Sequence, residues 1–121
     1  FIRAQIKAKR VRASHDISDG GLLVAAAELA MANAVGLTLE IAKSIPPHAF
    51  WFGEDQARYL IAANPDDAAA IAADAANAGI PCTMIGVAGG DALRADGLSA
   101  PIANLKSVHE GWMPDFMAGA D

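Results

Sequence analysis

The sequence predicts an α+β domain of the ferredoxin-like kind, in which helices pack on one face of a mostly antiparallel sheet. Three observations lead to this prediction. Short segments typical of strands alternate with two long alanine-rich segments, the order over residues 11–87 is β-α-β-β-α-β, and a C-terminal hairpin strand and helix follow. The 121 residues are enough to bury a core, so we expect residues 1–121 to form a single subdomain.

The first half of the chain supplies the first β-α-β unit. Residues 2–9 have the spacing of the last turns of a helix, and residues 11–16 form a short, partly β-branched strand. A helix is predicted from position 19 or 20 to position 33, because nothing in that range interrupts it. Gly36 is expected to end it as a C′ glycine. Residues 37–41 alternate apolar and polar side chains, which predicts a half-buried strand.

The middle of the chain supplies a loop, a strand and a helix. Two consecutive prolines make residues 43–53 a predicted loop, since proline donates no backbone hydrogen bond. Residues 57–63 are typical of a strand. Asn64 is placed to cap the next helix, Pro65 suits its first position and Gly79 ends it.

In the last third of the sequence, a buried strand is predicted over residues 82–87 and a short strand around Leu93, after a glycine-rich turn. Residues 101–109 are predicted as an amphipathic helix. An aromatic tail follows, in which Trp112 and Phe116 are interpreted as packing or interface anchors.

Composition narrows the function classes. The formal net charge of −5 argues against a nucleic-acid partner, and no apolar run is long enough to cross a membrane. Cys82 is the single cysteine, so no internal disulfide is possible and a reducing, cytoplasmic compartment is expected. Its apolar neighbours predict a packed strand residue. One basic run is interpreted as a solvated helix face, with phosphate binding as the alternative: Lys7, Lys9, Arg10 and Arg12.

The first candidate site is the stretch HDISDGG, residues 15–21, where a strand turns into a helix. The first turn of a helix has unpaired backbone N–H groups, and the adjacent Gly20 and Gly21 let a phosphate approach them. Ser18 can add a hydroxyl, and Asp19 can bind an accompanying cation, as can Asp16. The alternative is structural: Ser18 or Asp19 is a helix cap, and the two glycines permit close packing.

The second candidate site is the acidic cluster of Glu54, Asp55 and Gln56, which lies between a glycine and a strand. Polar side chains at such a position can project toward a ligand from a sheet edge. The alternative is a hydrated loop end in which Arg58 pairs locally. His15 is a candidate general base, but a histidine at a strand end is more often packed or hydrogen-bonded. We predict no catalytic residue and no metal ligand in this chain.

Three motifs together resemble one family. HDISDGGL at residues 15–22, FGEDQARY at 52–59 and HEGWMP at 109–114 are similar to the carboxy-terminal domain of the large, synthetase subunit of phosphoribosylformylglycinamidine synthase. This domain belongs to the aminoimidazole-ribonucleotide-synthetase C-terminal-domain superfamily. A motif related to the first one also occurs in thiamine-monophosphate kinase. The second motif narrows the choice of family.

The resemblance implies a ligase of de novo purine biosynthesis. With ATP and Mg²⁺, such an enzyme phosphorylates the amide oxygen of formylglycinamide ribonucleotide, and ammonia from a glutaminase subunit or domain displaces the phosphate. The chain would be the last of four subdomains and would pack with the others. The resemblance associates this half of the enzyme with an auxiliary nucleotide site. The predicted nucleotide- or phosphate-binding residues are therefore those of the two candidate sites: Ser18, Asp19, Gly20, Gly21, Glu54, Asp55 and Gln56. The last three match a substrate-contacting Glu-Ser-Gln element of the enzyme's first half, with aspartate in place of serine.

The family's catalytic histidine, metal carboxylates and main ATP contacts match no segment of this chain. We therefore expect a structural, nucleotide-site-completing role, no tightly bound cofactor and no activity of the 121-residue chain by itself. A leading strand is expected to be missing before Phe1, which would leave a sheet edge prone to self-association. The alternative is a free-standing ferredoxin-like regulatory module that binds a small metabolite at the Asp19-Gly20-Gly21 turn.

Overall fold

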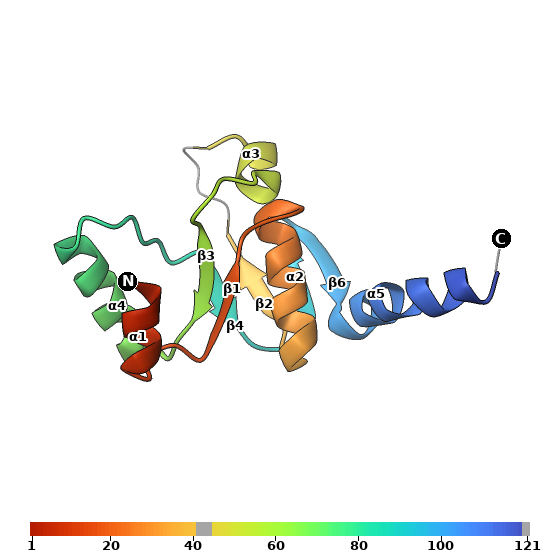
Figure 1. The fold of residues 1–121 in the computed structure, drawn as a ribbon, viewed down its shortest axis with the longest axis horizontal. Helices are drawn as coiled ribbons and strands as arrows, with labels where there is room; N and C mark the ends of the chain where they lie inside the picture. Colours follow the sequence, from red (N-terminus) through yellow and green to blue (C-terminus); the bar gives the residue numbers. More distant parts are fainter. Residues whose placement is uncertain (41–44, 120–121) are drawn as a thin grey trace.

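The computed structural model of the protein describes residues 1–40 and 45–119, and its architecture is α+β, as the sequence predicts (Figure 1). The predicted order is present as β1, α2, β2, β3, α4 and β4, followed by the β5–β6 hairpin and α5. The elements are α1 (Ile2–Lys7), β1 (Ala13–Asp16), α2 (Gly21–Asn33), β2 (Leu37–Leu39), α3 (Pro47–Phe52), β3 (Tyr59–Ala62), α4 (Pro65–Asn77), β4 (Gly86–Ala88), β5 (Ala92–Ala95), β6 (Leu98–Pro101) and α5 (Ile102–Met117).

The strands divide between two sheets. β1 and β3 form an antiparallel pair, and the other sheet has the order β4-β2-β5-β6. Within that sheet β2 pairs antiparallel with β4 and parallel with β5, and β5 pairs antiparallel with β6. The pairing is thus mostly antiparallel, as expected. No helix in the described ranges combines the length and the apolar character that a bilayer crossing requires.

The main core lies between α2 and the inner face of the four-stranded sheet. Alanines on α2 let the helix approach Leu37, Leu39 and Leu93 closely, because a methyl side chain keeps the helix narrow. α3 closes one end of this core with Phe50 and Trp51, whose rings meet edge to face at a centroid distance of 4.7 Å. α5 closes another part with the buried Ile102.

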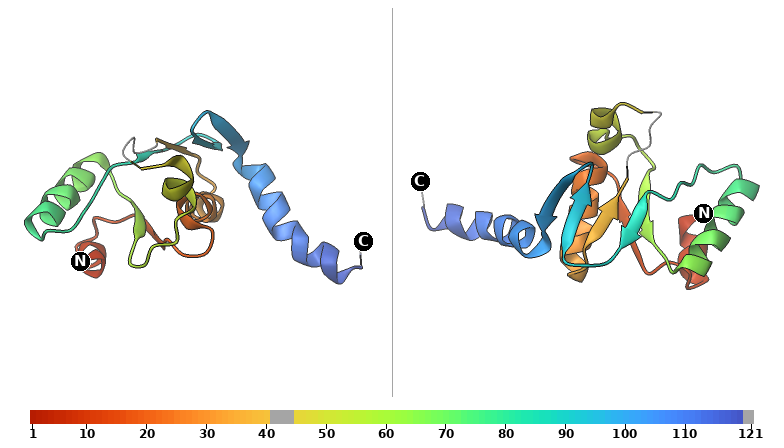
Figure 2. Two further views of the ribbon diagram at one scale, coloured as in Figure 1. Left: turned by 90° about the horizontal axis from the view of Figure 1, so that it is seen from above. Right: turned by 180° about the vertical axis from the view of Figure 1, so that it is seen from behind.

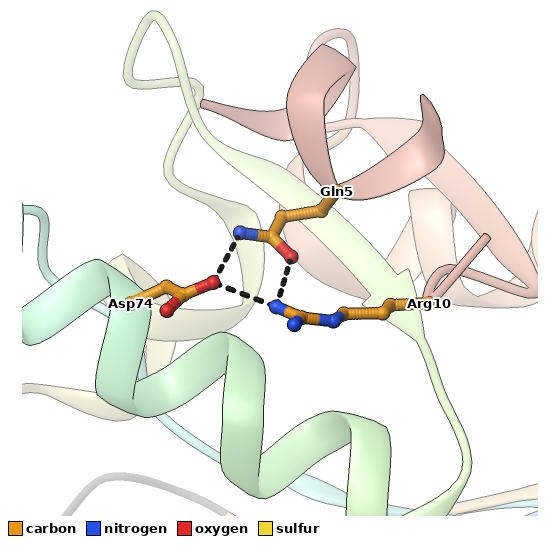
Figure 3. Close-up of polar contacts among 3 residues, drawn as sticks. All are labelled: Gln5, Arg10 and Asp74. Carbon is orange, nitrogen blue, oxygen red and sulfur yellow. Dashed lines mark hydrogen bonds and ion pairs between the residues drawn. The ribbon is translucent and has the colours of Figure 1, made fainter. Parts of the chain in front are cut away.

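A second contact joins α1 to α4, which lie side by side away from α5 (Figures 1 and 2). Arg10 donates a hydrogen bond to the Asp74 carboxylate at 2.7 Å, and the Gln5 amide donates to the same oxygen at 3.1 Å (Figure 3). Gln5 is buried, and its own oxygen accepts from Arg10 at 3.3 Å. Arg10 therefore does not belong to a merely solvated face, as the basic run predicted, although Lys7, Lys9 and Arg12 are exposed.

The predicted loop over residues 43–53 is wrong where the structure describes it, because residues 47–52 form α3. Pro46 is its N-cap and Pro47 its first residue, a position where the missing proline N–H costs nothing. The proline pair therefore starts a helix. Residues 43 and 44, and residue 41 of the predicted strand 37–41, lie outside the described residues.

The predicted buried strand over residues 82–87 is also wrong in part. β4 spans Gly86–Ala88, and Cys82 is exposed and precedes it. The contact with β2 continues one position before β4, where the Glu40 amide donates to the Ile85 carbonyl at 2.7 Å.

Two helix ends differ from the prediction. α2 ends with Ala34 in the left-handed conformation, at φ 52°, and not through Gly36. Gly36 serves close approach instead, since a Cβ there would lie 2.6 Å from the Ala92 carbonyl oxygen. At the other end of the chain, the helix predicted over residues 101–109 continues through the aromatic tail as α5, to Met117.

Candidate functional site

The HDISDGG stretch connects β1 to α2, as predicted. The β1–β3 ladder continues past Asp16, because the Ile17 amide donates to the Arg58 carbonyl at 2.9 Å. The chain then turns, with Gly20 at φ 80° and Gly21 at φ 73°, values that glycine adopts readily. Gly20 is the N-cap of α2 and has no side chain with which to cap the helix. The expectation that Ser18 or Asp19 caps α2 is therefore wrong; both side chains are exposed.

Glu54 brings the two candidate sites together. Its Oε1 accepts a hydrogen bond of 2.8 Å from the Gly20 amide, across 34 positions of sequence. A carboxylate at the amino end of a helix is favourable, since the first-turn amides and the helix dipole present positive charge there. Glu54 thus stands where an incoming phosphate would meet the Gly20 amide. This juxtaposition was not predicted, because no periodicity links residues so far apart.

Gly21 has a packing role that the sequence suggested as one of two alternatives. A Cβ at Gly21 would lie 2.6 Å from the Phe52 carbonyl carbon and 2.8 Å from the Trp51 carbonyl oxygen. The backbone of α3 therefore fills the space beside Gly21, where we expected a phosphate to approach. We call the residues Gly20, Gly21, Trp51, Phe52 and Glu54 the glycine junction.

The other two members of the acidic cluster make no described hydrogen bond with the Gly20 amide. Asp55 pairs with Arg58 at 3.3 Å, and Arg58 also donates to the Gly53 carbonyl at 3.2 Å. Gln56 is exposed. The local pairing of Arg58, which was the structural alternative for this cluster, is therefore present for Asp55. Ser18 and Gln56 are both exposed, and each lies two positions in sequence from a junction residue, Gly20 and Glu54 respectively.

His15 holds β1 against α2. Its Nε2 lies 3.0 Å from the Glu28 carboxylate, and its Nδ1 lies 2.6 Å from the Asp16 carbonyl oxygen. Both ring nitrogens face oxygen atoms of the chain, which fits the hydrogen-bonded alternative better than a general base. His15 and Glu28 also line an open groove of about 560 Å³ between β1, α2 and α5, together with Lys106 and His109.

The described residues do not fit a magnesium site. Nowhere in ranges 1–40 and 45–119 do three or more His, Cys, Asp or Glu side chains gather so that they could hold a metal ion. Asp16 and Asp19 are both exposed, and the Glu54 carboxylate is engaged with the Gly20 amide.

Sequence relatives cover nearly the whole chain. The phosphoribosylformylglycinamidine synthase subunit PurL of Methylocella silvestris is 52% identical over 121 residues, which are 99% of this chain and 16% of that protein. The PurL subunits of Parvibaculum lavamentivorans and Bradyrhizobium sp. (strain BTAi1) are 49% and 50% identical over 98% of this chain, again 16% of each relative. The chain therefore spans about a sixth of the length of these curated relatives.

Solved structures share the fold. T. maritima PurL complexed with ATP superimposes with a TM-score of 0.74 at 17% identity, over 85% of this chain and 20% of that one. T. maritima PurL complexed with FGAR gives 0.72 at 16% identity, over 85% and 19% of the two chains. At this identity the likeness shows the fold.

The family itself is identified by residues 1–96, which match the profile described as "AIR synthase related protein, C-terminal domain". That range includes β1, the glycine junction and the four-stranded sheet up to β5, and it ends before α5. The chain belongs to the C-terminal domain family of AIR synthase related proteins.

Proposed function

We propose that this chain is the C-terminal domain of an ATP-dependent synthetase that converts formylglycinamide ribonucleotide to formylglycinamidine ribonucleotide. The observation that carries the proposal is the 52% identity with a PurL subunit over 99% of the chain. The shared fold with T. maritima PurL, which is complexed with ATP in one structure and with FGAR in another, supports it. The relatives favour this function over the free-standing metabolite-binding module.

The role of the domain in that enzyme is structural and completes a nucleotide site. ATP and Mg²⁺ are the cofactors of the whole enzyme, a glutaminase subunit or domain supplies its ammonia, and its compartment is the cytoplasm. Ligation with ATP as energy source makes the enzyme a carbon–nitrogen ligase. Because α3 packs against Gly21 and Glu54 accepts from the Gly20 amide, we assign the nucleotide contacts to the exposed side chains of Ser18 and Gln56. The 121-residue chain by itself is expected to be inactive.

The whole-enzyme function is tested on the longer polypeptide that contains this chain. We expect ADP formation that requires both formylglycinamide ribonucleotide and a source of ammonia. ADP formation that ignores the ribonucleotide would contradict the proposal. The 121-residue chain, measured in the same assay, is expected to give the background rate.

The nucleotide-site role is tested by Ser18→Ala and Gln56→Ala in the same longer polypeptide. Neither side chain makes a described hydrogen bond to the backbone, so removal of its polar group should leave the melting temperature unchanged. We expect the nucleotide content of the purified protein, read by mass spectrometry, to fall in both variants. Ser107→Ala on α5 is the matched control, since Ser107 is also an exposed serine. Unchanged nucleotide content in both variants would leave the domain with a structural role alone.

A further inference from the structure

The last helix, α5, projects away from the rest of the domain (Figures 1 and 2). Its second half carries large apolar side chains that no described residue buries. Trp112 is 61% exposed and Phe116 is 65% exposed, and their rings stack at a centroid distance of 5.6 Å. With Val108 and Met113, both more than half exposed, they form what we call the distal face. Exposed apolar patches of this kind mark interaction sites.

The distal face continues a buried face of the same helix. Ile102 is buried and Leu105 packs against the core at the start of α5. Residues 102, 105, 109, 112 and 116 follow the spacing 3, 4, 3, 4, which places them along one side of a helix. The packed side of α5 therefore extends beyond the domain that covers its first turns.

The sequence of α5 shows that its second half needs outside support. Gly111 lowers helix stability by about 1 kcal/mol relative to alanine, and Pro114, inside the helix, by about 3 kcal/mol. The proline also removes one intrahelical hydrogen bond. An isolated helix shorter than about 12–15 residues is marginal in water even with strong helix formers, and the second half of α5 is shorter than that. Burial of the distal face against another surface would supply the missing stabilisation.

We propose that the distal face of α5 packs against an apolar surface of another domain of the same longer polypeptide. The relatives align across α5 as well as the domain, whereas the family profile ends at residue 96. The long PurL relatives therefore share the sequence region of α5. This chain is 16% of the length of those relatives, so a partner surface within the same chain is available at high effective concentration.

A second copy of this chain fits the distal face less well. The spacing of 3 and 4 covers residues 102–116, and its first part is already buried by the domain. A stable coiled coil requires a heptad pattern sustained over about three to four heptads. The part of the pattern that the domain leaves unburied is shorter than three heptads. Cover within the same polypeptide is therefore the occupant that we propose.

Hydrogen exchange on the longer polypeptide tests this inference, which rests on the proposed function only because it requires that longer chain. We expect the amides of residues 108–117 to be protected at every protein concentration. Trp112→Glu should lower that protection about tenfold or more, because it places a charge in the contact. Ser107→Glu is the matched control: the same charge on the opposite side of α5 should leave the protection unchanged. The readout does not depend on synthetase activity.

Two results would overturn the inference. One is exchange of residues 108–117 as fast as in an uncovered helix end. The other is protection that rises with protein concentration, because it would identify a second copy as the partner. If Trp112→Glu does not fold, Phe116→Gln provides the same comparison with a smaller change. A longer polypeptide that has no synthetase activity but still protects residues 108–117 would count against the proposed function. The present inference would stand in that case.

Discussion

The glycine junction, at the start of α2, and the distal half of α5 differ in how the helix end is stabilised. At the junction the partners come from within the domain: α3 packs against Gly21, and Glu54 accepts at 2.8 Å from the amide of Gly20, the N-cap residue of α2. In α5 the glycine and the proline weaken the helix, and the apolar side chains that would compensate are exposed. One helix end is complete within this domain, whereas the other depends on something outside it. The same residue type, glycine, is required in the first place and dispensable in the second.

Gly21→Ala should produce the largest effect, because the new methyl group would lie 2.6 Å from backbone of α3 at a positive φ. The strained conformation and the overpacking together should lower the free energy of unfolding by about 3 kcal/mol. Urea denaturation measures this. A loss well below 1 kcal/mol would show that α3 moves aside easily and that the junction is not closed.

Glu54→Ala should have a smaller effect, of about 1 kcal/mol, since it removes one hydrogen bond from the exposed end of α2. Glu54→Gln should recover part of the loss, because its amide oxygen still accepts from the Gly20 amide. Thermal unfolding of both variants gives the comparison. Glu110→Ala is the control, because Glu110 makes a solvent-exposed pair with Lys106 at 3.6 Å that is worth little.

Gly111→Ala should change stability in the other direction, with a gain of about 0.5–1 kcal/mol. A Cβ at Gly111 would meet only the Asp115 carboxylate oxygen, at 3.8 Å, among the described residues. Alanine would therefore strengthen α5 without a clash. Thermal unfolding of the longer polypeptide is the measurement. A loss of stability in this variant would reveal that another domain approaches Gly111 closely. α5 would then have a second side in contact with other domains.

The smallest effect concerns the contact between α1 and α4, which is half-exposed. Hydrogen bonds from Gln5 and Arg10 hold the pKa of the Asp74 carboxyl below its ordinary value. The folded state therefore binds the proton less readily than the unfolded state, so the stabilisation is complete above about pH 4 and is lost as the pH falls below it. Titration by NMR should give a lowered Asp74 pKa, and Arg10→Gln should raise it. An Asp74 that titrates at its ordinary value would contradict the contact.

Sequence patterns predicted the elements that depend on local periodicity. The alanine-rich α2 and α4, the α+β class and the hairpin with its terminal helix all follow from spacing and from punctuation by glycine and proline. The Asp96-Gly97 turn of that hairpin, with φ of 50° and 79°, is a signal that could have placed β6 more sharply. Local chemistry was thus sufficient where neighbours in sequence decide the structure.

The candidate site was predictable in composition and not in arrangement. The motifs pointed to both halves of the glycine junction, but the bond between Gly20 and Glu54 spans 34 positions. The prolines before α3 were interpreted as breakers, although proline also starts helices. Gln5 and Asp74 gave no motif at all, because their contact depends on how two helices at distant positions come together.

The contact between α1 and α4 has a consequence for the order of events during synthesis. Gln5 finds its carboxylate partner 69 positions later in the chain. At a synthesis rate of about 5–20 residues per second, Asp74 is made roughly 3–14 seconds after Gln5. Over that interval the side chain that will be buried between the two helices has no carboxylate partner. The first helix of the domain therefore reaches its final place only after α4 has been made.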